Sequence, residues 1–138
     1  MTEREHEAQR WFNQALHELG VSGRLLQQAD YDWCCLAAQQ SAEKAMKALR
    51  ILRGEEAERV HSVYRLIVGG VEGLPPIREL EPLVNDAKSL DKVYIPSRYP
   101  NGIPFGSPYE YFTAEEGQRC IQQAERICSG VAALSGGI

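Results

Sequence analysis

We predict an all-α protein, an antiparallel bundle of four main helices and one short helix, from three features of the sequence. Apolar residues recur at the spacing of amphipathic helices over most of the chain. Glycine and proline cluster in a few segments that separate these stretches. No stretch of useful length alternates as a strand does. With 138 residues, 43% of them hydrophobic and 25% charged, the chain is predicted to form a single domain over residues 1–138.

Two amphipathic helices are predicted in the first part of the chain. The first spans about residues 3–29 and the second about residues 32–53, with the turn QADYD between them. Each has an apolar stripe of the kind that packs against a core. Gly54 is typical of the residue that follows a helix. The stripes are Ala8, Trp11, Phe12, Ala15, Leu16, Leu19 and Leu26 in the first helix, and Cys34, Ala38, Ala42, Ala45, Leu49 and Leu52 in the second.

Three further helices are predicted in the rest of the chain. A short helix spans about residues 62–71, and the segment GGVEGLPP then breaks the helical pattern. Residues 77–94 resume it, with Pro82 in the first turns, where proline is tolerated. The last helix begins after Thr113, which forms a capping-box pattern with Glu116, and continues to Leu134.

The second helix has a mixed face opposite its small residues. Glu43 and Lys47 are four residues apart there and can pair. One interpretation is a solvated face, and the other is a partner or dimer surface, because such surfaces mix apolar anchors with polar pairs. We favour the partner surface, which consists of Trp33, Leu36, Gln40, Glu43 and Ile51, with Lys47 and Arg50 on the same side.

A stiff loop, YIPSRYPNGIPFGSPYEYF, precedes the last helix and contains a proline at every fourth position and one cation, Arg98. Because prolines flank it, Arg98 is held with little loss of entropy on binding. Arg98 can therefore contact a carboxylate or phosphate, with Tyr99 packed on a base or on the guanidinium. Alternatively, Arg98 pairs with an acid on an adjacent helix and locks the loop. The two roles can coexist.

His61 stands immediately before the short helix. Its simpler role is a cap or a local hydrogen bond. Its other role is a donor, near neutral pH, to a phosphate or a partner carboxylate. No neighbour in the sequence supplies an orienting acid or a nucleophile, so we expect no catalytic role.

Composition and motifs exclude several classes of protein. A net charge of −4 argues against broad nucleic-acid binding. Neither an apolar run of membrane-spanning length nor a signal-peptide pattern occurs, so we expect a cytoplasmic protein. The cysteines do not have the spacing of a zinc site, so we expect buried, reduced thiols and no metal or cofactor. The common nucleotide-hydrolase and protease motifs do not occur, and no catalytic residue is assigned.

The order of motifs resembles the HEPN domain family over about residues 10–131. An early aromatic segment, RWFNQA, is followed by DYDWCCLAAQQSAEKAMKALRILRG, by His61 before a short helix, by RYP, and by a last helix. The segment around RYP is most similar to the version in the C-terminal domain of sacsin. It is also similar to free-standing prokaryotic members that are encoded beside minimal nucleotidyltransferases.

The resemblance implies a helical homodimer that binds a nucleotide, such as GTP or ATP, or another anion in a cleft at the dimer interface. It also implies that the chain could assist a nucleotidyltransferase or form part of a larger chaperone-like protein. By this resemblance, Lys44, Lys47, His61 and Arg98 supply cations and Tyr99 supplies an aromatic wall. The alternative is a module that only dimerises or docks another protein.

A second branch of the same family consists of metal-independent endoribonucleases and toxins with an R-x4-6-H motif late in the chain. Arg10 and His17 match the spacing, but they lie in the first predicted helix and face away from its apolar stripe. The last helix contains no histidine. Ribonuclease activity is therefore our second alternative.

Overall fold

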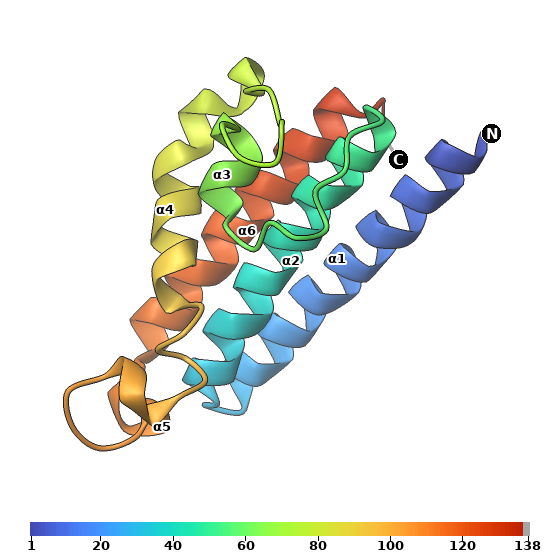
Figure 1. Ribbon diagram of the computed structural model, residues 1–138. Coiled ribbons are helices and arrows are strands. Elements are labelled where there is room, and N and C mark those ends of the chain that lie inside the picture. Colours follow the sequence, from blue (N-terminus) through green and yellow to red (C-terminus); the bar gives the residue numbers. More distant parts are fainter. Residues whose placement is uncertain (137–138) are drawn as a thin grey trace.

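The computed structural model describes residues 1–136 and confirms an all-α bundle (Figure 1). The four longest helices are α1 (Glu3–Gln27), α2 (Tyr31–Leu52), α4 (Val84–Val93) and α6 (Ala114–Leu134). The shorter elements are α3 (Val63–Val68), α5 (Pro108–Tyr111) and the 3-10 helices η1 (Arg78–Leu83) and η2 (Pro100–Gly102).

The core of the bundle forms around α2. Small buried residues such as Ala15, Ala38 and Ala42 let α1 approach α2 closely, and α6 packs against another side of α2 (Figure 1). Buried serines also join α1 to α2: the Ser41 hydroxyl donates to the carbonyl of Ala15 at 2.7 Å. This packing buries or half-buries the apolar stripes that the sequence predicts on α1 and α2, except at Leu16, which is 46% exposed.

Local capping signals set several helix ends as predicted. Thr113 and Glu116 form the capping box of α6, with the Thr113 amide donating to the Glu116 carboxylate at 3.0 Å. After α2, Gly54 has a φ of 78°, which glycine adopts without strain.

Two predicted helices are shorter or more divided than the periodicity suggests. The short helix ends at Val68 because Gly69 turns the chain at a φ of 71°. A Cβ at this position would lie 2.3 Å from the carbonyl oxygen of Leu74. The predicted helix 77–94 is a 3-10 helix followed by α4, since Pro82 provides no amide hydrogen for an α-helical bond. Likewise, the proline-rich loop contains the short elements η2 and α5.

The connection between α2 and α3 runs back along α2 (Figure 1). Its backbone and one of its side chains contact the polar face of α2: the Lys47 ammonium donates to the backbone carbonyl of Glu58 at 3.1 Å, and Arg50 donates to the Glu55 carboxylate at 2.9 Å. The interpretation of this face as a solvated one is therefore wrong for Glu43, Lys47 and Arg50, which are 5%, 4% and 0% exposed.

The four cysteines, Cys34, Cys35, Cys120 and Cys128, are buried free thiols, as expected. Burial raises the pKa of Cys34 and of Cys128. Within residues 1–136, no three metal-binding side chains of the kinds His, Cys, Asp and Glu group as a metal site would require. Over the same residues, no helix combines the length and the hydropathy needed to cross a membrane.

Candidate functional site

His61 is an exposed histidine that contacts a buried carboxylate. Its Nδ1 lies 3.3 Å from Oε2 of Glu43, and the side chains of His61 and Glu43 are 56% and 7% exposed. Glu43 comes from α2, whereas His61 ends the connection that crosses α2. With a proton on Nδ1 shared with this carboxylate, Nε2 carries the lone pair. The arrangement therefore orients the imidazole and leaves Nε2 for another group.

The Glu43 carboxylate is held by further partners on its own helix. Lys47 Nζ lies 3.0 Å from the same oxygen that His61 contacts, and Gln39 Nε2 donates to the other oxygen at 3.2 Å. Gln39 in turn accepts a hydrogen bond from Gln40 at 2.8 Å. The ion pair of Glu43 and Lys47 is buried and its hydrogen bonds are satisfied, so the Glu43 carboxylate is held in place. It therefore fixes the position of the His61 Nδ1 atom that contacts it.

A row of stacked side chains extends from His61 into the proline-rich loop. The His61 and Tyr94 rings are nearly parallel, with centroids 6.3 Å apart and planes 9° apart. The Arg98 guanidinium carbon lies 4.3 Å from the Tyr94 ring centroid and 5.0 Å from that of Tyr99. Arg98 also donates from Nε to the carbonyl of Tyr94 at 3.1 Å. We call His61, Tyr94, Arg98 and Tyr99 the stacked site.

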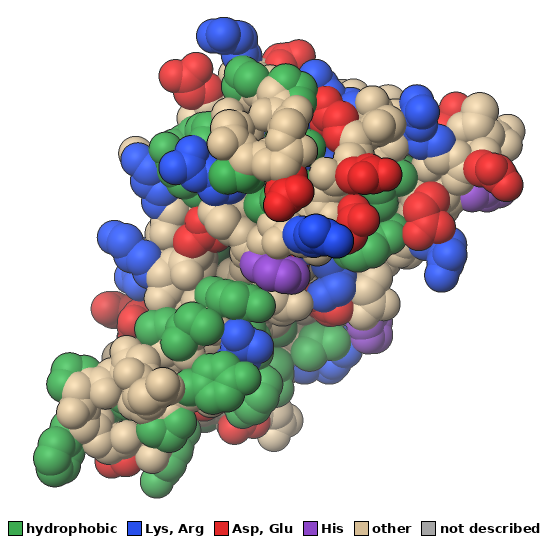
Figure 2. Space-filling model, in the orientation of Figure 1, with side chains coloured by type: hydrophobic (Ala, Val, Ile, Leu, Met, Phe, Trp, Pro, Cys, Tyr) green, Lys and Arg blue, Asp and Glu red, His purple; other side chains and the backbone are tan. Residues whose placement is uncertain are grey.

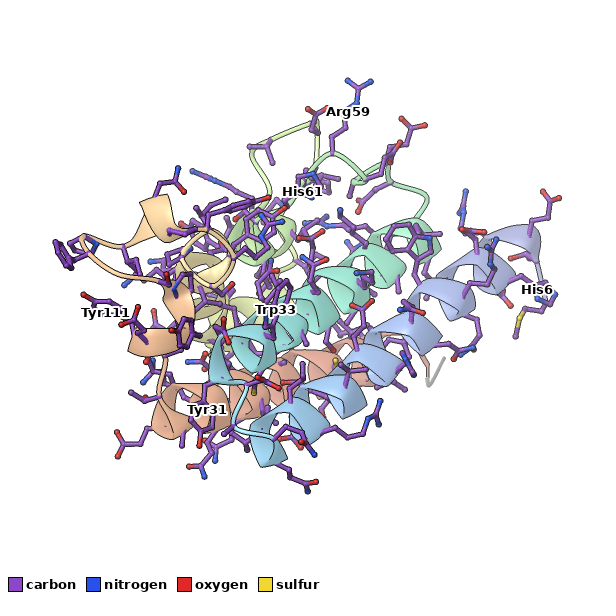
Figure 3. The ribbon with its side chains drawn as sticks, turned by 90° about the horizontal axis from the view of Figure 1, so that it is seen from below. His6, Tyr31, Trp33, Arg59, His61 and Tyr111 are labelled. Atoms are coloured by element: carbon purple, nitrogen blue, oxygen red, sulfur yellow. The ribbon has the colours of Figure 1, made fainter. Side chains whose placement is uncertain are left out.

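This row lies on a face rich in hydrophobic side chains. They gather over the loop that follows α4 (Figure 2), where Ile95, Tyr99 and Phe105 are 45%, 49% and 82% exposed. Trp33, which is 52% exposed, extends from α2 on the side where His61 lies (Figure 3). Aromatic faces next to one guanidinium can stack on a planar ring while the cation contacts an anion.

Asp91 on α4 fixes the start of α3, directly after His61. Its carboxylate accepts from the Ser62 hydroxyl at 2.6 Å and from the amides of Val63 and Tyr64 at 2.7 and 3.2 Å. These bonds satisfy amides that have no partner within α3. Asp91 therefore positions the backbone that carries His61.

The Asp91 carboxyl gives the free energy of unfolding a specific pH dependence. Burial raises its pKa above the ordinary value of 3.8, although the hydrogen bonds from Ser62, Val63 and Tyr64 act to lower it. A native pKa above the unfolded pKa means that the stabilising contribution is complete below the unfolded pKa. This contribution is lost as the pH rises through the native pKa.

We therefore expect the wild type to lose stability relative to Asp91→Asn as the pH rises from about 3 to about 7. Asparagine keeps an acceptor for the α3 amides but does not titrate. Urea denaturation of both proteins across this range measures the difference. A difference that stays constant with pH would contradict the assignment.

The two lysines that the family resemblance selects are both engaged within the chain. Lys47 is buried beside Glu43, so it is barely accessible from solvent. Lys44, 23% exposed in its side chain, pairs with Glu18 at 2.9 Å and donates to Gln40 at 3.1 Å. The stacked site contains His61, Arg98 and Tyr99 from the predicted set, and neither lysine.

The predicted partner surface is also divided. Leu36 and Glu43, both predicted on the partner surface, are instead buried against their own chain, at 8% and 5% exposed. Gln40 and Ile51 are half-buried, and Trp33 is the most exposed of the five. Trp33 therefore remains accessible to a partner on α2, but the five residues do not form one continuous accessible surface.

Arg10 and His17 have no place in this site. Both are exposed on α1, where Arg10 pairs with Glu7 at 3.0 Å and is 78% exposed in its side chain. Arg98 also differs from one of its predicted roles, because none of the ion pairs within residues 1–136 includes it. Its neighbours are tyrosine rings and not an acid of an adjacent helix.

Sequence reasoning missed the contact between Glu43 and His61 and the place of Tyr94. Eighteen residues separate the acid from the histidine along the chain, and only the return of the connection along α2 brings them together. Tyr94 begins the proline-rich loop and precedes Arg98 by four residues. The spacing of four residues between Tyr94 and Arg98 was the available signal, because it places two side chains on one face of a helix. Tyr94 is the C-cap residue of α4 and has helical backbone angles.

Comparison with known proteins identifies a domain family and a relative of this chain. Residues 8–134 match the HEPN domain. A Methanocaldococcus jannaschii protein named "Putative toxin MJ1304" is 30% identical over 126 residues, which cover 87% of this chain and 82% of that protein.

Solved structures give the same result. The chain is similar to TT1696 from Thermus thermophilus, with a TM-score of 0.81 and 38% identity, over 91% of this chain and 96% of that one. It is similar to ST0689, described as an archaeal HEPN homologue, with a TM-score of 0.76 and 34% identity over 93% and 97%. A HEPN domain protein from Thermotoga maritima aligns with a TM-score of 0.68 and 27% identity over 94% and 99%.

Proposed function

Because this chain belongs to the HEPN domain family, we propose that it is a non-catalytic, dimeric module that binds a nucleotide or another anionic ligand at the stacked site. The observation that carries the proposal is the position of Arg98 against Tyr94 and Tyr99, at 4.3 and 5.0 Å from their ring centroids. A cation that forms no ion pair within residues 1–136, between the half-buried Tyr94 and the exposed Tyr99, favours a ligand with both a planar ring and a negative charge.

The ligand that fits this chemistry is a purine nucleotide such as GTP or ATP. Its base would stack on the exposed Tyr99, and its phosphates would contact the Arg98 guanidinium. His61 would add Nε2, as an acceptor for a ligand hydroxyl, on the far side of Tyr94 along the row. Lys44 and Lys47, which are paired with Glu18 and Glu43, would stabilise the fold and would not contact the ligand.

The dimer in this proposal uses the exposed Trp33, which lies on the same side of α2 as His61 (Figure 3). Half-buried Gln40 and Ile51 are on the same helix. A second copy that packs on Trp33 would close the stacked site from one side and make it a cleft. The module could then assist a nucleotidyltransferase or another domain of a longer protein.

Calorimetric titration with GTP, ATP and inorganic phosphate tests ligand binding, and sedimentation tests the dimer. The proposal predicts saturable heat with a nucleotide, weaker binding of phosphate alone, and a dimer that Trp33→Glu dissociates. Absence of saturable heat would contradict the nucleotide part. A dimer without nucleotide binding would favour the alternative of a protein-interaction module.

A second candidate function is metal-independent ribonuclease activity, which the contact of His61 with buried Glu43 favours. The relative named as a toxin is consistent with it. His61 Nε2 would take the proton of a ribose 2′-hydroxyl while the 2′-oxygen attacks the adjacent phosphorus. The bond from phosphorus to the 5′-oxygen breaks, and that oxygen takes a proton from water. The imidazolium then returns its proton to the hydroxide, and the products are a 2′,3′-cyclic phosphate and a 5′-hydroxyl.

For this candidate we expect cleavage of RNA without added metal and a loss of about a hundredfold or more in His61→Asn. The matched control is His17→Asn, which alters an exposed histidine on α1 and should cleave as wild type does. Chain cleavage followed by gel electrophoresis measures both. Intact RNA with the wild type, or equal cleavage by His61→Asn, would eliminate this candidate.

A further inference from the structure

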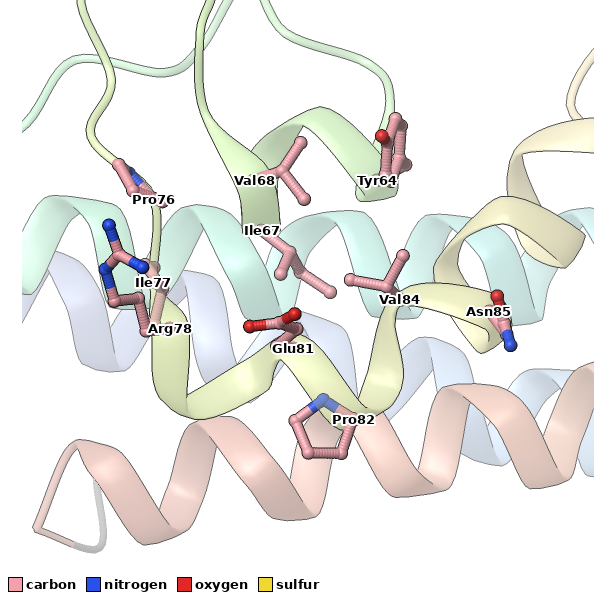
Figure 4. Close-up of a pocket in the computed structure, with 10 residues that line it drawn as sticks. All are labelled: Tyr64, Ile67, Val68, Pro76, Ile77, Arg78, Glu81, Pro82, Val84 and Asn85. Atoms are coloured by element: carbon pink, nitrogen blue, oxygen red, sulfur yellow. The ribbon is translucent and has the colours of Figure 1, made fainter.

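A hollow lies between α3, η1 and the start of α4 (Figure 4), and none of its lining residues belongs to the stacked site. Its volume is about 600 Å³, within the range of about 300 to 1,000 Å³ that is typical of ligand sites. Ile67 and Ile77, each 1% exposed, form the floor. Val68 and Val84 form half-buried walls. We call this hollow the α3 groove.

The α3 groove is built on a stiff backbone. The amide of Ile77 donates to the carbonyl of Ile67 at 2.8 Å, which joins the two floor residues directly. Pro76 and Pro82 line the groove and restrict the backbone on either side of the 3-10 turn. A groove that is already formed in the free protein orders little on binding, so a ligand loses less free energy to conformational entropy.

Three exposed cations lie in or next to the lining of the groove. Arg65 and Lys88 lie 5.3 and 5.0 Å from the ring centroid of Tyr64, which lines the groove, and Arg78 lines it as well. None of the ion pairs within residues 1–136 includes these three exposed cations. Glu81 is the acid among the lining residues. These three cations outnumber the lining acid Glu81, although the chain has a net charge of −4.

The shape of the groove favours a chain segment over an enclosed small molecule. Pro82, Arg78 and Glu81 are exposed, so a bound group would keep one side in solvent. Figure 4 shows Arg78 on one side of the groove and Tyr64 and Val84 on the other, with Ile67 between them. Apolar side chains could thus fill the centre while carboxylates meet cations at both ends.

We propose that the α3 groove docks a short acidic peptide segment of a partner protein. Apolar side chains of the segment pack on Ile67 and Ile77, and flanking carboxylates pair with Arg78 at one end and with Arg65 and Lys88 at the other. The lining of the α3 groove shares no residue with the stacked site, so a partner protein and a nucleotide could be bound together.

Nuclear magnetic resonance of the ¹⁵N-labelled protein tests this docking with the probe peptide Ac-EELLEE-NH2, and Ac-KKLLKK-NH2 is the charge-reversed probe. We expect saturable shifts of α3 and η1 amides with the acidic peptide and none with the basic one. Arg78→Glu and Lys88→Glu should each weaken binding by about tenfold. Arg119→Glu, an equal charge change on the exposed face of α6, should leave binding unchanged.

Three results would overturn the proposal. The first is an absence of saturable shifts at millimolar acidic peptide, and the second is equal shifts from the basic peptide. The third is saturation of the groove by hexanoate at a concentration equal to or below that of the peptide, which would assign the site to a small organic anion. The charge changes are at exposed side chains and should leave the fold intact. The same spectra verify the fold of each variant.

Discussion

Replacement of Glu43 by alanine is expected to lower the free energy of unfolding by about 3 to 5 kcal/mol, since it leaves one half of a buried ion pair unpaired. Lys47 is only 5% exposed in its side chain and would keep the Glu58 carbonyl as its remaining partner. His61 would also lose the carboxylate that orients it. Urea denaturation followed by circular dichroism measures the loss.

Two variants separate the charge of Glu43 from its size. Glu43→Gln keeps an acceptor for Lys47 and should lose less stability than Glu43→Ala. The double variant Glu43→Leu with Lys47→Met removes both charges and should recover most of the loss, because no unpaired charge remains buried. A loss below about 1 kcal/mol in Glu43→Ala, as at an exposed pair, would contradict a buried role for this pair.

Replacement of Arg98 by alanine is expected to weaken nucleotide binding by about tenfold or more, the effect of losing a hydrogen bond to a charged group. Its effect on stability should be small, because its hydrogen bond within the chain is to the Tyr94 carbonyl and it has no ion pair within residues 1–136. Calorimetric titration of GTP into wild type and variant gives the ratio of affinities.

Arg98→Lys and Arg119→Ala are the matched controls for this measurement. Lysine keeps the charge but not the planar guanidinium that stacks on Tyr94 and Tyr99, so it should restore only part of the affinity. Arg119→Ala removes an exposed arginine of α6 and should bind as the wild type does. Equal affinities for wild type and Arg98→Ala would remove Arg98 from the ligand site.

Most of the fold follows from local signals. The apolar stripes of α1 and α2, the glycine after α2, and the Thr113 and Glu116 capping box each depend on residues within a few positions of one another. Such signals depend little on the rest of the fold, so the sequence alone is enough to read them. Pro82 is an exception. The chain tolerates it within a helix, as predicted, but the turns that contain it are 3-10 and not α-helical.

The interior of the site depends on contacts between distant segments, which periodicity does not reveal. The polar pattern on α2 predicts an exposed face, yet the connection after Leu52 covers it and pairs its side chains. The same return of the chain brings His61 to Glu43. For Arg98, the proline spacing indicated a constrained cation, but only the fold shows that tyrosine rings surround it.

Nuclear magnetic resonance of the protein with labelled tyrosine and histidine side chains, titrated with GTP, tests the central claim most directly. The claim predicts saturable shifts of the Tyr94, Tyr99 and His61 rings, with the Tyr64 ring of the α3 groove unchanged. The absence of saturable shifts, or saturable shifts at Tyr64 without changes at Tyr94 and Tyr99, would contradict a nucleotide site at the stacked residues.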